Sequence, residues 1–246
     1  MDNKKIIAMW SGPRNLSTAL MYSFENRGDT KIEDEPFYGY FLSNNEIMHP
    51  ERDTIINIME TNKYKLISYL SDIENIQNKR IWYQKQMTHH ININDDISWI
   101  KYITNCFLIR DPIEVIASYK KIYSEVSMNL IGLEQQNKIF DYVLNNINDK
   151  PLVIDAYDLR NNPESILKKA CQKLNIKFTK KMIQWPEGPK KNEGVWGKFW
   201  YQNVWNTTSF IKQKNNQNKK VPLNIKKLCE QAKIFYDKLY HYKINP

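Results

Sequence analysis

A short segment near the N-terminus carries the residue types that bind anions in proteins. Gly12-Pro13-Arg14-Asn15-Leu16-Ser17-Thr18 lies between the strand-like run Lys4 to Met9 and a helical pattern. Backbone N–H groups at a helix start, together with the helix dipole, attract phosphate and sulfate groups. Gly12 permits a close backbone approach. Arg14 adds a fixed positive charge, and Ser17 and Thr18 add hydroxyl donors. The segment therefore predicts an anion-binding loop after the first strand.

This loop departs from the pattern of nucleoside triphosphate-binding loops, G-x-x-x-x-G-K-[ST]. The Gly-Lys pair of that pattern is absent, and Leu16 precedes Ser17 and Thr18. ATP or GTP binding is therefore disfavoured, although a nucleotide-dependent kinase or phosphotransferase stays as an alternative. An ordinary helix start with capping residues is the alternative interpretation of this segment.

A second candidate anion site follows another buried run, Cys106 to Ile109. Arg110 ends this run, and Ser118 lies eight residues later, two turns into a helix that Asp111 and Pro112 open. An arginine fork gives charge-assisted contacts to an anion, and a serine hydroxyl adds one more donor. A strand-end arginine paired with Asp111 is the alternative.

These two segments resemble the sulfotransferases that use 3′-phosphoadenosine 5′-phosphosulfate (PAPS). Pro13 to Thr18 matches the family pattern P-K-S-G-T-T, with Arg14 in the lysine position and Leu16 in place of glycine. The resemblance implies that this loop holds the 5′-phosphosulfate and that Arg110 and Ser118 hold the 3′-phosphate. Arginine gives up a proton poorly, so Arg14 would stabilise charge on the bridging oxygen rather than protonate it.

A third segment resembles the same family. Three of the seven glycines lie within Gly188 to Gly197, and residues 190–198 resemble the family pattern R-K-G-x-x-G-x-W-K, with Asn192 in place of the first glycine. A flexible basic loop is the alternative. The resemblance implies a segment that covers the nucleotide, with its basic residues on the 3′-phosphate, and its candidate residues are Lys190, Lys191, Gly194 and Trp196.

Transfer of a sulfuryl group to an alcohol requires a base beside the acceptor hydroxyl. Glu35 follows the second strand and resembles the glutamate of bacterial trehalose and heparan-type sulfotransferases, so it is the first choice. Lys85 to His90 is similar to the K-T-H segment of cytosolic sulfotransferases, in which lysine contacts the sulfuryl group and histidine is the base. The base is therefore either Glu35 or one of His89 and His90, and Lys85 is placed at the sulfuryl group.

Strand-like runs alternate with helical patterns along the chain. This alternation predicts an α/β fold with a central, mainly parallel sheet between helical layers. We expect a P-loop NTPase-like three-layer fold in a single sulfotransferase domain spanning residues 1–246, with a mobile loop at 212–220. Strands are expected at 4–9, 30–35, 80–85, 106–109 and 152–155, and helices at 15–27, 50–62, 64–76, from 112, within 120–150, at 163–174 and from about 222. Asn162 and Pro163 are expected to cap and open the helix at 163–174 as Asp111 and Pro112 do for theirs.

The charge balance needs no nucleic acid to explain it. The 246 residues include 36 Lys+Arg and 27 Asp+Glu, which gives a formal net charge of +9. A basic nucleic-acid-binding protein is the non-enzymatic alternative, but it offers no reason for the spacing of Arg110 and Ser118. A few cations suffice for a doubly phosphorylated nucleotide. We therefore expect a small-molecule acceptor with a hydroxyl or amine group, and neither nucleic acid nor a membrane as partner.

Cysteine and histidine usage bears on compartment and metal binding. The three cysteines are scattered and odd in number, which indicates a reducing compartment and a cytoplasmic protein. Ser11 to Arg14 interrupts the first apolar run too early for a secretory signal. The Cys and His residues lack the spacing of metal ligands. We expect PAPS as co-substrate, PAP as product and no metal; the acceptor's identity and the oligomeric state leave no readable pattern.

Overall fold

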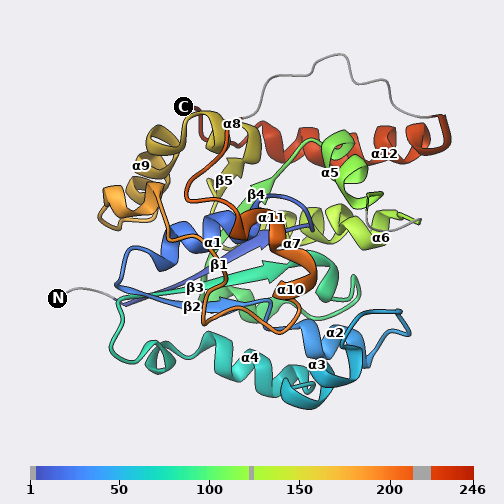
Figure 1. The fold of residues 1–246 in the computed structure, drawn as a ribbon, viewed down its shortest axis with the longest axis horizontal. Coiled ribbons are helices and arrows are strands. Elements are labelled where there is room, and N and C mark those ends of the chain that lie inside the picture. The colour runs from blue at the N-terminus through green and yellow to red at the C-terminus, as the bar shows by residue number, and fades with distance from the viewer. Residues whose placement is uncertain (1–3, 122–124, 213–222) are drawn as a thin grey trace.

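Five parallel strands form the central sheet of the protein. The computed structural model describes residues 4–121, 125–212 and 223–246, and the strands lie in the order β2-β3-β1-β4-β5 (Figure 1). Each of the four neighbouring pairs is parallel. This confirms the expected α/β class and places β1 at the centre. The strands are β1 (Lys5–Ser11), β2 (Thr30–Asp34), β3 (Ile81–Met87), β4 (Thr104–Ile109) and β5 (Leu152–Asp155).

The order of the strands creates a crevice at one edge of the sheet. The chain leaves β1 toward β2 and β3 on one side, and then crosses to β4 and β5 on the other. In open α/β sheets, ligands bind outside the carboxyl ends of the strands where the strand order reverses in this way. The segments that follow β1 and β4 flank this point, and they contain the two predicted anion sites.

Helices cover both faces of the sheet (Figure 1). The α-helices of the described residues are α1 (Ser17–Glu25), α2 (Tyr38–Ser43), α3 (Arg52–Ile58), α4 (Lys63–Ser71), α5 (Pro112–Tyr119), α6 (Met128–Ile131), α7 (Leu133–Asn146), α8 (Ala156–Asn161), α9 (Pro163–Lys173), α10 (Gly197–Trp200), α11 (Gln202–Trp205) and α12 (Leu223–Tyr240). The short 3₁₀ helices are η1 (Ile73–Ile76), η2 (Thr88–His90), η3 (Ser98–Tyr102) and η4 (Lys180–Ile183).

The sheet is buried on both faces, which explains the almost continuous apolar run of β1. Ile7 and Met9 belong to the core that packs α1 and α9, whereas Ala8 and Trp10 belong to the core that packs α4 and α7. Strands of parallel sheets that are covered on both sides are apolar at successive positions rather than at alternate ones. The core therefore fixes the end of β1, from which the first predicted loop begins.

Most expected elements are confirmed with ends shifted by a few residues, but the two Asx-Pro pairs differ. The Asp111 carboxylate accepts a hydrogen bond from the N–H of Ile113 at 2.8 Å and caps α5. Asn162 precedes α9 but makes no side-chain cap bond within the described residues, so its expected capping role is wrong. Helices α2, α8, α10 and α11 were not expected. The expected mobile loop at 212–220 lies outside the described residues, apart from Lys212.

Gly12 is required for packing rather than for ligand approach. A Cβ atom at this position would lie 2.3 Å from the carbonyl oxygen of Ile131, the last residue of α6. Gly12 is buried, and it does not line the cavity described below. The glycine therefore lets the end of β1 approach the backbone of α6.

Gly12→Ala is expected to lower the free energy of unfolding by about 1–3 kcal/mol, because the added methyl group overpacks a backbone contact that has no side chain to move aside. Urea unfolding followed by circular dichroism measures this change. An unchanged unfolding midpoint would contradict the close packing of Gly12 on Ile131.

Candidate active site

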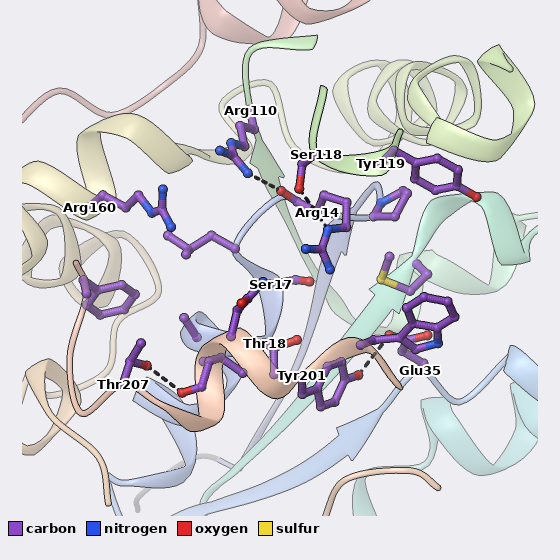
Figure 2. Close-up of a pocket in the computed structure, with 18 of the residues that line it drawn as sticks. Arg14, Ser17, Thr18, Glu35, Arg110, Ser118, Tyr119, Arg160, Tyr201 and Thr207 are labelled. Atoms are coloured by element: carbon purple, nitrogen blue, oxygen red, sulfur yellow. Dashed lines mark hydrogen bonds between the residues drawn. The ribbon is translucent and has the colours of Figure 1, made fainter. Parts of the chain in front are cut away.

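A cavity of about 490 Å³ lies where the predicted site residues converge (Figure 2). Its walls come from the segments after β1, β2, β3 and β4, from α8 and from the C-terminal segment 200–211. The lining residues are Pro13, Arg14, Leu16, Ser17, Thr18, Ala19, Glu35, Tyr38, Met87, His89, His90, Arg110, Ser118, Tyr119, Arg160, Trp200, Tyr201, Asn203, Val204, Thr207, Ser209, Phe210 and Ile211.

The first loop has two left-handed residues just before α1. Leu16 has φ 72° and Arg14 has φ 63°, both in the left-handed region that favours glycine. Leu16 occupies the position where the family pattern has glycine. It precedes α1 without a side-chain cap bond in the described part of the chain. The first N–H groups of α1 therefore depend on other acceptors, as in helix starts that bind phosphate or sulfate.

Not every residue of this loop reaches the cavity. Pro13, Arg14, Leu16, Ser17 and Thr18 line it, whereas Gly12 and Asn15 are not among the lining residues.

Asn15 fastens the loop from behind. Its side chain is buried, and its Nδ2 lies 3.4 Å from the carbonyl oxygen of Leu108 in β4. The buried Gln136 amide donates to the carbonyls of Trp10 and Leu108 at 2.9 and 3.0 Å. These amides hold the ends of β1 and β4 together, so Asn15 shapes the loop instead of contacting a ligand in the cavity.

The two predicted anion sites are joined by direct hydrogen bonds. Arg14 Nε donates to Ser118 Oγ at 3.1 Å, and Arg110 donates to the carbonyl oxygen of Arg14 at 2.7 Å (Figure 2). Arg110 also pairs with Glu114, one helical turn further on, at 3.0 Å. The loop after β1 and the helix after β4 therefore form one continuous basic wall.

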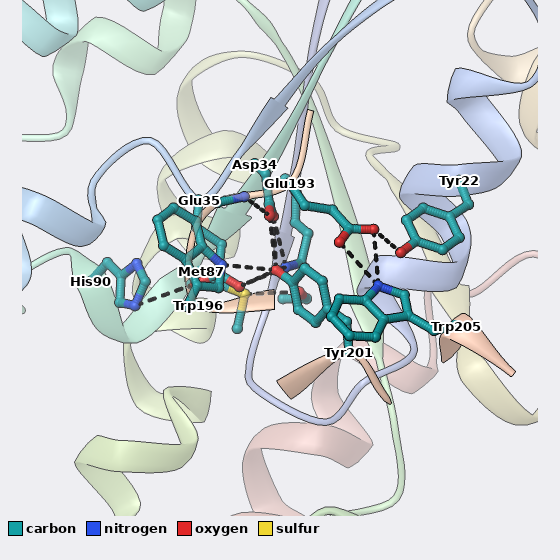
Figure 3. A network of polar contacts seen from close by, with 12 residues as sticks. Tyr22, Asp34, Glu35, Met87, His90, Glu193, Trp196, Tyr201 and Trp205 are labelled. Atoms are coloured by element: carbon teal, nitrogen blue, oxygen red, sulfur yellow. Dashed lines mark hydrogen bonds and ion pairs between the residues drawn. The ribbon is translucent and has the colours of Figure 1, made fainter. Parts of the chain in front are cut away.

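Glu35 belongs to a buried network beside the cavity (Figure 3). Lys85 Nζ lies 2.5 Å from Glu35 Oε1 and 2.9 Å from Asp34 Oδ1. The Tyr201 hydroxyl lies 2.5 Å from Lys85 Nζ and 3.1 Å from Glu35 Oε1. Glu35 itself has φ 52°, so a strained backbone turns its side chain at the end of β2.

Burial and charge act against each other within this network. Burial raises the pKa of Asp34, while the neighbouring Lys85 acts to lower it. For Lys85, burial acts to lower the pKa, but Asp34 and Glu35 raise it above its ordinary value. Lys85 is therefore a permanent cation between two carboxyl groups. Its side chain is 1% exposed and is not among the cavity-lining residues, so the structure does not bring it to the sulfuryl position expected from the K-T-H resemblance.

His89 and His90 both line the cavity. Burial lowers the pKa of both well below the ordinary value, and for His90 the nearby Lys85 lowers it further. The His90 ring stacks on Tyr38 and Phe41, with ring centroids 4.5 and 4.8 Å away. His90 Nε2 lies 3.9 Å from Glu35 Oε2, so the histidine pair and Glu35 face the same end of the cavity.

The expectation that Lys190 and Lys191 reach the cavity is not met. Lys190 Nζ donates to the carbonyl oxygens of Pro186 and Gly188 at 2.6 Å each, which ties the side chain to its own turn. Lys191 is exposed and is not among the lining residues.

Gly194 and Trp196 also lie outside the cavity lining, although they support the site from behind. The N–H of Gly194 donates to Asp34 at 3.2 Å, and the indole N–H of Trp196 donates to the Tyr201 hydroxyl at 3.0 Å. These two residues therefore hold the Asp34–Tyr201 part of the buried network.

Several lining residues were missed by sequence reasoning. Arg160 lies on α8, which directly follows β5, and Tyr119 ends α5 one residue after Ser118. Thr207 and Ser209 come from the segment after α11. The position of Arg160 after the fifth strand could have revealed it, because the carboxyl ends of parallel strands meet at the same edge of the sheet. Thr207 and Ser209 follow no strand, and no pattern marked them.

The profile of the sulfotransferase domain family matches residues 4–240. The chain belongs to this family.

Solved structures of other sulfotransferase domains share the fold. The domain from the olefin synthase of Synechococcus PCC 7002 superposes with a TM-score of 0.59 at 15% identity, over 93% of this chain and 94% of that domain. The domain from the curacin biosynthetic pathway superposes with a TM-score of 0.52 at 12% identity, over 99% of both chains. At this identity the likeness shows the fold, which is the P-loop NTPase-like three-layer fold of sulfotransferases.

Curated relatives from Arabidopsis thaliana carry a different kind of name. The branched-chain-amino-acid aminotransferase-like protein 1 is 32% identical over 237 residues, which are 96% of this sulfotransferase chain and 42% of the relative. Protein 2 is 31% identical over 206 residues, or 84% of this chain and 36% of the relative. The chain spans less than half the length of these relatives, whose names describe proteins more than twice as long.

Two further features concern membranes and metals. Across residues 4–121, 125–212 and 223–246, no helix of this sulfotransferase is long and apolar enough to span a bilayer. The same residues contain no cluster of three or more His, Cys, Asp or Glu side chains that could hold a metal ion.

Lys85→Met is expected to destabilise the sulfotransferase domain by about 3–5 kcal/mol, because it leaves Asp34 and Glu35 buried beside each other without their cation. Thermal and urea unfolding measure the loss. Lys65→Met removes an exposed lysine and is the matched control, for which a change below about 0.5 kcal/mol is expected. Equal stability of the two variants would contradict the buried ion network.

Proposed function

We propose that this sulfotransferase moves a sulfuryl group from PAPS to a hydroxyl or amine of a small-molecule acceptor and releases PAP. The observation that carries the proposal is the convergence of three segments on one cavity. One cavity is lined by the Arg14 loop after β1, by Arg110 and Ser118 after β4, and by Glu35 after β2. The basic wall suits a donor with two anionic groups, the phosphosulfate and the 3′-phosphate. The carboxylate suits a neutral acceptor that must lose a proton.

The basic wall is assigned to the donor. The start of α1, with Arg14, Ser17 and Thr18, is the proposed site for the 5′-phosphosulfate. Arg110 and Ser118 are the proposed partners of the 3′-phosphate. The hydrogen bonds from Arg14 to Ser118 and from Arg110 to the Arg14 backbone support this, because they place the two groups of donors side by side. Such preorganised donors stabilise charge as it develops on the leaving oxygen.

Glu35 is the proposed base. It would take the proton from the acceptor hydroxyl or amine as the acceptor atom forms its bond to sulfur. The bond from sulfur to the bridging oxygen then breaks, and the electron pair leaves with PAP. Burial lowers the pKa of His89 and His90 well below its ordinary value, and the His90 ring is held by packing against Tyr38 and Phe41. These features favour Glu35 over the histidine pair.

Lys85 and Tyr201 are assigned to positioning. Both contact Glu35 Oε1, which leaves Oε2 toward His90. Two contacts on one oxygen fix the rotamer of the Glu35 carboxylate. A base that is already oriented loses no further conformational entropy when the reaction occurs.

We further propose that the chain forms one domain and works in the cytoplasm. Cys106, Cys171 and Cys229 are all buried free thiols, as is usual for proteins of a reducing compartment.

PAP is expected to raise the melting temperature of the protein, whereas ATP with Mg²⁺ is not. At a concentration of 100 times its Kd, a ligand that binds only the folded state stabilises it by about 2.7 kcal/mol, which corresponds to roughly 5–10 °C for a domain of this size. Differential scanning fluorimetry gives the comparison. A shift with ATP and Mg²⁺ but not with PAP would overturn the donor assignment in favour of a kinase.

Glu35→Gln is expected to lower turnover about 10²–10⁴-fold while PAP affinity stays unchanged, because the amide keeps the size of the side chain but cannot accept the acceptor's proton. The measurement is PAP release from PAPS over a panel of hydroxyl and amine acceptors. Glu33→Gln changes the same residue type two positions earlier on β2, away from the cavity lining, and should retain turnover. Full activity of Glu35→Gln would move the base to His89 or His90.

A further inference from the structure

Arg160 brings a cation into the cavity from a strand that the predicted sites do not use. It lies in the last turn of α8, directly after β5, and it lines the cavity together with Arg14 and Arg110. Figure 2 shows Arg160 and Arg110 on the side of the cavity away from Glu35. Three arginines therefore share the walls with one carboxylate, Glu35, among the lining residues that the structure describes.

Arg110 and Arg160 bring two positive charges to the same side of the cavity (Figure 2). Burial lowers the pKa of Arg160 from its ordinary value, and the charge of Arg110 lowers it further, while Glu114 raises it. Glu114 also pairs with Arg110 at 3.0 Å. Both guanidinium groups lie in half-buried places, where solvent screens charges less than at an open surface. An anion bound between them would be attracted by both.

A dianionic phosphate fits the two guanidinium groups of Arg110 and Arg160. A phosphate monoester carries a charge of about −1.5 to −2 near neutral pH and offers three acceptor oxygens, which match the forked donors of two arginines. We propose that Arg160 and Arg110 together form the subsite for the second phosphate of the donor, the phosphate that is not bonded to the sulfuryl group. This inference rests on the proposed function, and it gives Arg160 the task expected of Lys190 and Lys191.

The C-terminal segment also lines the cavity. Ser209 lines it as a further hydroxyl, and Phe210 and Ile211 line it as apolar neighbours. A charged group bound beside apolar walls is screened less by water, so each contact to it is stronger. Arg160 should then decide between donors that carry the second phosphate and donors that lack it.

The experiment compares two ligands that differ only in that phosphate. Isothermal titration calorimetry at fixed ionic strength gives the affinities of PAP and adenosine 5′-phosphate for the wild type, Arg160→Gln and Arg160→Lys. Arg160→Gln should weaken PAP about 10- to 100-fold, as for one lost charged contact, and should leave adenosine 5′-phosphate within about twofold. Arg160→Lys keeps the charge without the fork, so its PAP affinity should lie between those of the wild type and Arg160→Gln.

Two further variants separate this subsite from general electrostatics. Arg80→Gln removes an exposed arginine outside the cavity lining and should leave both ligands unchanged. Lys191→Gln tests the basic loop directly. Selective loss of PAP in Lys191→Gln but not in Arg160→Gln would overturn the proposal, and so would equal loss of both ligands in Arg160→Gln. If the wild type does not bind PAP, the donor assignment itself is wrong; if it binds PAP and Arg160→Gln binds it equally well, the Arg160 subsite alone is refuted.

Discussion

The ammonium group of Lys85 holds together parts of the chain that are far apart in sequence. It contacts Asp34 and Glu35 at the end of β2 and Tyr201 in the C-terminal segment, while Lys85 itself lies within β3. A buried charge must be paired, because removing it from water costs several kcal/mol. Since Lys85 and Tyr201 contact each other and both contact Glu35, the position of Glu35 and the closure of the C-terminal segment over the site depend on one another.

The sequence was informative where function follows local geometry. The loop after β1, the pair Arg110 and Ser118, and Glu35 all stand directly after strands, and parallel strands end at one edge of the sheet. Their convergence could be expected before any contact was known. The same rule applied to β5 would have drawn attention to Arg160, which was not among the predicted site residues.

The roles of the lysines could not be predicted, because the type of a residue does not reveal which group its side chain contacts in the folded protein. Lys190 was expected to meet a ligand, yet its ammonium group is taken up by carbonyl oxygens of its own turn. Lys85 was expected at the reacting group, yet it lies behind Glu35. Leu16 shows the opposite case: a bulky residue keeps a left-handed backbone that glycine would adopt freely, while its side chain packs against the core that covers α1. The packing of the Leu16 side chain thereby compensates the strain of its left-handed backbone, which the sequence pattern alone does not reveal.

The C-terminal segment that supplies Tyr201 and the wall at 200–211 sets the order in which the site can appear during synthesis. The five strands of the described residues are complete by Asp155, so the sheet can form before residues 200–211 have left the ribosome. Until Tyr201 arrives, Lys85, Asp34 and Glu35 lack their shared hydroxyl, and the cavity lacks one side. A nascent chain can therefore have its sheet folded while the cavity is still incomplete, and the cavity closes only once residues 200–211 have been made.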